Sequence, residues 1–265
     1  MNIFWYELKA YRGTTLLWTA SLAGIVLLMM AMFPSFAKDA DAFREVLQSM
    51  PEAVMKAVGL QLDSITSLIG FYSYIFTYVT LCGSIQAMHL GTSILSKEGR
   101  EKTADFLLAK PVTRGAVFAA KSLAALTLLL LTNAVFFGAA GLIATAVKIA
   151  SFDFGIFALI TLSLLLIQLV FLAIGFAAAL LLPRMKTVLP VTLGTVFAFF
   201  IISFIGASTG DGKLRYLTPF QYFDRSYIAA HGGYEPEFLI ASAVIAAVCL
   251  TYGIVRYAKR DVQAT

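Results

Sequence analysis

Charged side chains are scarce in this sequence. Only 13% of its 265 residues are Asp, Glu, Lys or Arg, against roughly a quarter in soluble proteins, and 60% are hydrophobic. There are only two cysteines, Cys82 and Cys249, and their spacing matches neither a disulfide framework nor a metal site. This composition, with a mean hydropathy of +0.85, excludes a soluble globular domain and indicates an integral membrane protein.

Motifs for nucleotide hydrolysis and metal-dependent proteolysis are also missing. The sequence contains neither a GxxxxGK[ST] phosphate loop nor an HExxH pair. No apolar run carries Asp, Glu, Lys or Arg near its middle, where ion-coupled carriers usually keep an ionisable group. We therefore expect no catalytic residue, cofactor or metal on this chain, and we expect any ATP to be hydrolysed by another protein.

Six apolar runs are long enough to cross roughly 30 Å of hydrocarbon as helices. They cover residues 14–33, 65–95, 116–147, 154–182, 188–207 and 238–257. The second and third are longer than a bilayer requires, so we expect them to tilt or to extend past the membrane. Lys121 marks the part of the third run that lies near the cytoplasmic face. The sequence thus predicts an all-α, polytopic membrane protein with one domain, residues 1–265.

Basic residues are concentrated in the segments that share a side with the N-terminus. These segments carry 13 basic and five acidic residues, a net charge of +8, whereas the opposite segments carry seven basic and ten acidic residues, a net charge of −3. The positive-inside rule therefore places both termini in the cytoplasm. This asymmetry accounts for the overall charge of +5, and no nucleic-acid partner is needed to explain it.

Three segments outside the runs have recognisable patterns. Residues 2–12 mix aromatic and charged side chains, which favours an interfacial helix on the inner membrane surface. The outer segment 34–64 has apolar residues at helical spacing, which indicates two amphipathic helices. In the outer segment 208–237, Thr218 and Pro219 are typical of the start of a short helix.

The second run carries small residues at every fourth position, namely Gly83, Ala87 and Gly91. Such a stripe lets helices approach closely in lipid, and it fits either packing within the chain or a dimer interface. The main strongly polar side chains at membrane depth are Gln86, His89, Asn133 and Gln168.

Residues 206–210 match the GxSxG pattern of serine hydrolases, and His231 lies in the same outer segment. That motif requires a strand, a strained turn and a helix, together with an acid that orients the histidine. Here it falls at the end of a membrane run, so we expect Ser208 not to be catalytic.

The loop 96–114, SKEGREKTADFLLAKPVTR, combines many charges with three adjacent apolar residues. Its sequence resembles a motif of about E-x-G-T-L-E-x-L-L-x-x-P-V-x-R in the permease subunits of ABC-2 type transporters. The spacing from Thr103 to Leu107-Leu108, Pro111 and Arg114 is kept, whereas residues 98–103 replace the compact E-x-G-T and residues 104–106 stand at L-E-x.

The resemblance implies that the loop is a coupling helix on which a separate cytoplasmic ATPase docks. Thr103 can cap that helix, and Asp105 suits its positive N-terminal end. The apolar side chains of Phe106, Leu107 and Leu108 would be costly to leave in water but would stabilise binding in a groove of the partner. Lys102 and Arg114 can pair with acidic groups on the partner, and Pro111 ends the helix, so that Thr113 caps the next span. The docking residues expected are Glu98, Lys102, Thr103, Asp105, Phe106, Leu107, Leu108, Pro111 and Arg114.

The function expected from this resemblance is ATP-driven export of a hydrophobic or amphipathic substrate, such as a peptide, drug or lipid, across the bacterial cytoplasmic membrane. The partners implied are the ATPase, which carries ATP and Mg²⁺, a second permease subunit, identical or paralogous, and membrane lipid. Two other classes remain open: a membrane anchor or regulator that recruits a cytoplasmic partner without transport, and an intramembrane enzyme.

Overall fold

A computed structural model describes residues 3–38, 67–101, 113–182, 185–210 and 212–259. Six long helices dominate these residues: α1 (Ile3–Ala31), α5 (Leu68–Glu101), α7 (Arg114–Val147), α8 (Phe154–Leu181), α9 (Leu189–Thr209) and α12 (Pro236–Lys259). The short elements are α2 (Phe33–Lys38), α10 (Gly212–Arg215), the 3-10 helix η1 (Pro219–Gln221) and α11 (Arg225–His231). The described part contains no strand.

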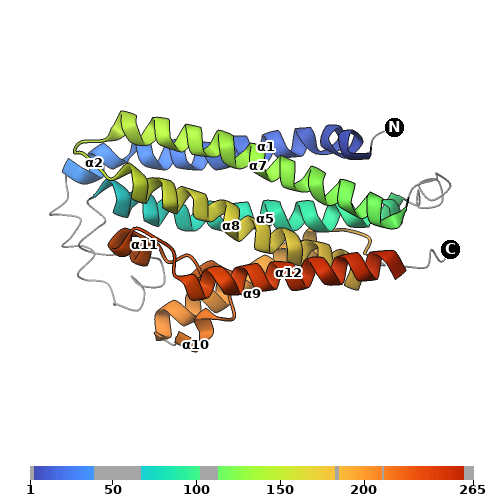
Figure 1. The fold of residues 1–265 in the computed structure, drawn as a ribbon. Coiled ribbons are helices and arrows are strands. Elements are labelled where there is room, and N and C mark those ends of the chain that lie inside the picture. Colours follow the sequence, from blue (N-terminus) through green and yellow to red (C-terminus); the bar gives the residue numbers. More distant parts are fainter. Residues whose placement is uncertain (1–2, 39–66, 102–112, 183–184, 211, 260–265) are drawn as a thin grey trace.

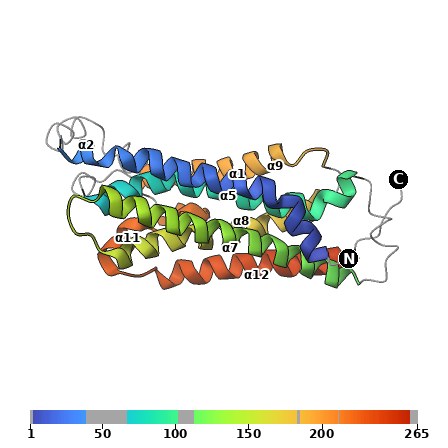
Figure 2. The ribbon, with the colours of Figure 1, turned by 90° about the horizontal axis from the view of Figure 1, so that it is seen from above.

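The six long helices are apolar enough to span a membrane, which confirms the predicted all-α polytopic fold. They form two layers of three, with α1, α5 and α9 in one layer and α7, α8 and α12 in the other (Figures 1 and 2). The middle helices α5 and α8 pack against each other, as do α1 and α7, and α8 and α12. Both described chain ends lie at the end of the bundle where α5 finishes and α7 begins, which we call the loop end.

Glycines bring α5 and α8 into backbone contact. A Cβ added at Gly91 would lie 2.5 Å from the Leu172 carbonyl oxygen, and one added at Gly175 would lie 2.7 Å from the Met88 carbonyl oxygen. Gly83 also faces α8, where an added Cβ would meet the Leu164 side chain at 2.6 Å. Of the two readings left open for the small-residue stripe, the structure therefore shows packing within the chain at both glycines, while Ala87 between them is fully buried.

Three of the four strongly polar side chains at membrane depth hydrogen-bond to one another. Asn133 on α7 donates to the Gln168 side-chain oxygen at 2.5 Å, and Gln168 on α8 donates to the Gln86 oxygen at 3.2 Å. Gln86 on α5 donates to Thr132 at 3.0 Å, and Thr19 on α1 donates to the same hydroxyl at 3.0 Å. The chain of bonds therefore connects four helices in the middle of the bundle.

The connection from α9 to α12 folds back against the bundle at the end opposite the loop end. Gln221 donates to the Ser203 carbonyl oxygen at 2.6 Å, and Arg215 forms a two-pronged ion pair with Glu235. The Tyr234 hydroxyl donates to the Leu159 carbonyl oxygen at 2.7 Å, and burial raises the pKa of Tyr234 to about 12.

Several local expectations can be compared with the structure. Thr113 caps α7 by accepting a hydrogen bond from the Ala116 N–H, as predicted. Thr218 precedes the short helix η1, but its hydroxyl donates to the Phe199 carbonyl instead of capping that helix. Residues 3–12 form no separate interfacial helix, because α1 is continuous, although its first turns bend across the loop end (Figure 2). The amphipathic helices expected in 34–64 lie mostly outside the described residues.

We expect Gly175→Ala to lower the stability of the protein in detergent, because the new methyl group would meet the α5 backbone. The cost of such overpacking is about 1 to 3 kcal/mol, measurable as a lower midpoint of thermal unfolding. Gly141→Ala is the matched control on α7, since nothing lies within 4 Å of its added Cβ. Equal stability of the two variants would contradict the close α5–α8 contact.

Candidate functional site

The candidate site is the loop end of the bundle, where α5 finishes at Glu101 and α7 begins at Arg114. Of the expected docking residues, only Glu98 and Arg114 belong to the described part. Arg114 donates to the Ala258 carbonyl oxygen at 3.5 Å, which connects the start of α7 to the end of α12. Lys102, Thr103, Asp105, Phe106, Leu107, Leu108 and Pro111 lie outside the described residues.

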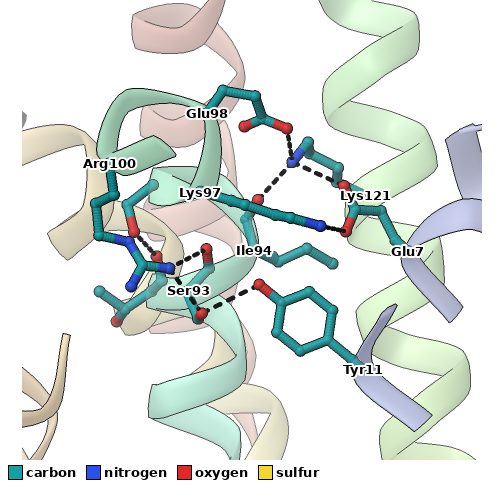
Figure 3. A network of polar contacts seen from close by, with 10 residues as sticks. Glu7, Tyr11, Ser93, Ile94, Lys97, Glu98, Arg100 and Lys121 are labelled. Carbon is teal, nitrogen blue, oxygen red and sulfur yellow. Dashed lines mark hydrogen bonds and ion pairs between the residues drawn. The ribbon is translucent and has the colours of Figure 1, made fainter. Parts of the chain in front are cut away.

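Lys121 is the centre of an ionic cluster at this end (Figure 3). Its side chain on α7 is fully buried, and its ammonium group has three acceptors. These are the Ile94 carbonyl oxygen at 2.6 Å, the Glu98 carboxylate at 2.5 Å and the Glu7 carboxylate at 3.1 Å. Because a lysine ammonium has three N–H donors, this arrangement uses its whole hydrogen-bonding capacity.

Glu7 extends the cluster to a third helix. It lies on the second turn of α1, is only 1% exposed, and uses both of its carboxylate oxygens. One oxygen faces Lys121, and the other lies 3.5 Å from the ammonium group of Lys97 on α5. Glu7 therefore joins α1 to the last turns of α5 and to the first turns of α7 (Figure 3).

Arg100 folds back along α5 beside this cluster. Its guanidinium donates to the Ser93 carbonyl oxygen at 3.3 Å and to the Ser93 hydroxyl at 3.0 Å. The same hydroxyl lies 3.0 Å from the Tyr11 hydroxyl of α1. The ammonium group of Lys97 also stands over the ring of Tyr6, 4.6 Å from its centre, which is close enough for a cation–π interaction.

The cluster has two positive and two negative side chains, so its charges balance. This balance determines how a substitution changes the stability of the protein. The four residues are Lys97, Lys121, Glu7 and Glu98. Removing one partner of a buried ion pair costs about 3 to 5 kcal/mol, because the other charge stays buried without compensation. Removing one charge of each sign can be nearly neutral. The cluster therefore fixes the relative positions of three helices more than it adds stability.

Sequence reasoning missed this cluster. It placed Lys121 near the cytoplasmic face but gave it no partner, and it assigned Glu7 to a surface helix. The available signal was the single lysine inside the apolar run 116–147, because an ionisable group within a span is expected to have an opposite charge beside it.

A second feature of the site is a line of side chains on the outward face of α5, opposite α8. Tyr74, Tyr78, His89 and Arg100 are separated by roughly one to three helical turns, and the helical period places them on the side of α5 opposite Gly83 and Gly91. All four are partly exposed, Tyr78 at 37%, and the hydroxyls of Tyr74 and Tyr78 are 3.1 Å apart. We call these four residues the α5 polar line.

The outward faces of α7 and α12 differ from this line. The exposed residues of α7 include Leu123, Leu130, Leu131, Val135 and Leu142, and those of α12 include Ile240, Val244, Val248 and Ile254. Such surfaces suit lipid tails, whereas tyrosine hydroxyls, an imidazole and a guanidinium do not.

Among the residues that the structure describes, the hydrogen bonds of Ser208 and His231 do not connect these two side chains. The Ser208 hydroxyl donates to the Phe204 carbonyl oxygen at 2.8 Å, inside the last turns of α9. His231 belongs to α11, where its ring stacks on Tyr227 and Nδ1 lies 3.1 Å from the carbonyl oxygen of the same residue.

We expect Lys121→Met to lower the free energy of unfolding by about 3 to 5 kcal/mol, because it leaves the buried Glu7 with only Lys97, at 3.5 Å, and takes from Glu98 its ion-pair partner. Lys9→Met is the matched control, since Lys9 is exposed on α1. Thermal unfolding in detergent measures both variants. Adding Glu7→Gln to Lys121→Met rebalances the charges, so we expect the double variant to recover most of the loss.

The comparisons with known proteins agree with the six-helix architecture. A family model described as ABC-2 family transporter protein matches residues 1–262, nearly the whole chain. A comparison with curated proteins finds no match. Members of the matched family are membrane transport components rather than enzymes. The chain therefore belongs to the ABC-2 family of transporter proteins.

Proposed function

We propose that this chain is the permease subunit of an ATP-driven exporter in the bacterial cytoplasmic membrane. Two permease subunits, identical or paralogous, form the pathway, and separate ATPase subunits that bind ATP and Mg²⁺ dock on the cytoplasmic loop between α5 and α7. Membership of the ABC-2 family supports the ATPase partnership. The excess of basic residues supports the cytoplasmic position of the loop end.

The observation that carries a transport role is the α5 polar line. It lies on the side of α5 opposite the glycines that contact α8, where lipid tails would offer no hydrogen-bond partner to the imidazole of His89. A second permease subunit facing this surface would enclose the line between two protein walls. The enclosed path would then offer hydroxyl, imidazole and guanidinium groups between apolar side chains.

Such a path suits an amphipathic substrate. Its polar part would meet Tyr74, Tyr78 and His89, while its apolar part would remain against α1 and α9. A hydrophobic or amphipathic peptide, drug or lipid has this character. Closure of the ATPase subunits on ATP would act on the loop, and the helices would rearrange to move the substrate outward.

A membrane anchor that recruits a cytoplasmic partner without transport is the competing function. It would use the same loop, but it gives no role to a polar surface in the middle of the membrane. Water access to the α5 polar line therefore separates the two functions.

We expect Phe106→Ala and Leu107→Asp to abolish ATP-driven export and to release the ATPase, because apolar anchors in a partner groove carry most of the binding energy of such contacts. Co-purification of an ATP-hydrolysing subunit with the tagged chain measures docking. Leu217→Asp is the control, since Leu217 is an exposed residue in the segment between α9 and α12. Retention of the ATPase and of coupled export by both loop variants would exclude this docking site.

We expect single cysteines at positions 78 and 89 to react with a membrane-impermeant thiol reagent in the assembled transporter. The background carries Cys82→Ala and Cys249→Ala, which remove both native thiols. Leu131→Cys is the control, because Leu131 is 55% exposed on the apolar face of α7 and would lie in lipid. Equal protection of all three positions, with the ATPase bound, would favour the anchor function.

A further inference from the structure

The ionic cluster joins the two flanks of the docking loop to a helix that is distant in sequence. Glu98 lies one turn before the end of α5, and Lys121 lies two turns after the start of α7, so their ion pair holds the two ends of the loop together. Glu7 accepts from the same ammonium group, and it belongs to α1. A displacement of the loop ends is therefore applied directly to the first turns of α1.

The first turns of α1 also contact the inner end of the α5 polar line. The Tyr11 hydroxyl lies 3.0 Å from the Ser93 hydroxyl, which accepts from Arg100, the last member of the line. Tyr11 is one turn beyond Glu7 on α1. Movement of Glu7 would thus change the contact between Tyr11 and the Arg100 end of the α5 polar line.

The burial and the hydrogen bonds of the cluster favour a rigid connection between α1, α5 and α7, through which a movement of one helix is passed to the others. Lys121 has no exposed surface, and Glu7 has almost none, so no water replaces a lost partner. The Ile94 carbonyl adds a main-chain contact at 2.6 Å, which fixes the ammonium group against the α5 backbone rather than against side chains alone. Interfaces packed in this way move as units.

We propose that Lys121 and Glu7 are positioning residues that transmit displacement of the docking loop to α1 and so change the contact of Tyr11 with the Arg100 end of the α5 polar line. This inference rests on the proposed function, because it requires an ATPase on the loop. It assigns to α1 a movement that is coupled to α7 and independent of α9.

The test measures distances between spin labels in the complex with the co-purified ATPase, with and without ATP and vanadate. Labels are attached at Lys9→Cys on α1, Ala119→Cys on α7 and Leu189→Cys on α9, all of which replace exposed residues in the Cys82→Ala, Cys249→Ala background. Labelled subunits are diluted with unlabelled ones, so that only distances within one chain are recorded.

In the chain with the native cluster, we expect the distance from position 9 to position 189 to change by about 2 Å or more on ATP binding, and the distance from 9 to 119 to stay constant. In the charge-balanced Glu7→Gln, Lys121→Met variant, we expect the ATPase to remain bound but the change between 9 and 189 to be lost. Lys121→Arg, which keeps the charge, retains at least part of the change.

A full change between 9 and 189 in the charge-balanced variant would show that the cluster is only structural and would overturn the proposal. So would a constant 9–189 distance, or a varying 9–119 distance, when the cluster is intact. If the charge-balanced variant does not assemble, the 9–189 and 9–119 distances in the chain with the native cluster test the proposal alone. Failure of any ATPase to co-purify with the unaltered chain would instead count against the proposed function.

Discussion

A polar group inside the hydrocarbon of a membrane has no water to bind, so it must find its partner on another helix. This constraint determines which helices of this chain lie together. Lys121 on α7 requires acceptors, and it finds them on α5 and α1. The amides in the middle of the bundle bind one another across α5, α7 and α8 for the same reason. Apolar packing alone is compatible with many arrangements of six hydrophobic helices. These polar contacts between helices favour one of them.

Helix α5 makes both the polar contacts and the close glycine contacts of the bundle. It is less apolar than α8, because it presents a different chemistry on each side. Glycines on one side allow close contact with α8, and Gln86 and the cluster around Ile94 face α1 and α7. The remaining side carries Tyr78 and His89, which are both at least partly exposed. A helix with polar groups on its open side is hard to explain as a lipid-facing element.

Much of the fold could be predicted from the sequence, because hydrophobic length and charge act locally along the chain. The six spans, the Thr113 cap and the close approach at Gly83 and Gly91 all follow from short stretches of sequence. The pairing of Glu7 with Lys121 could not be derived in this way, since the two residues lie on different helices far apart in the chain. The continuity of α1 was also missed, because mixed aromatic and charged residues suit a surface helix and the end of a span equally well. The docking helix stays a prediction from family resemblance.

The ionic cluster also has a consequence for biogenesis. Glu7 is synthesised before the first span, but Lys121 emerges only with the third, so during translation the carboxylate must wait at the membrane surface without its buried partner. Lys97 of the second span can pair with Glu7 first, but the ion pair between the first and third spans forms only after the third has been inserted. The loop between α5 and α7 is translated before Lys121, yet its two ends are brought together only when that lysine arrives.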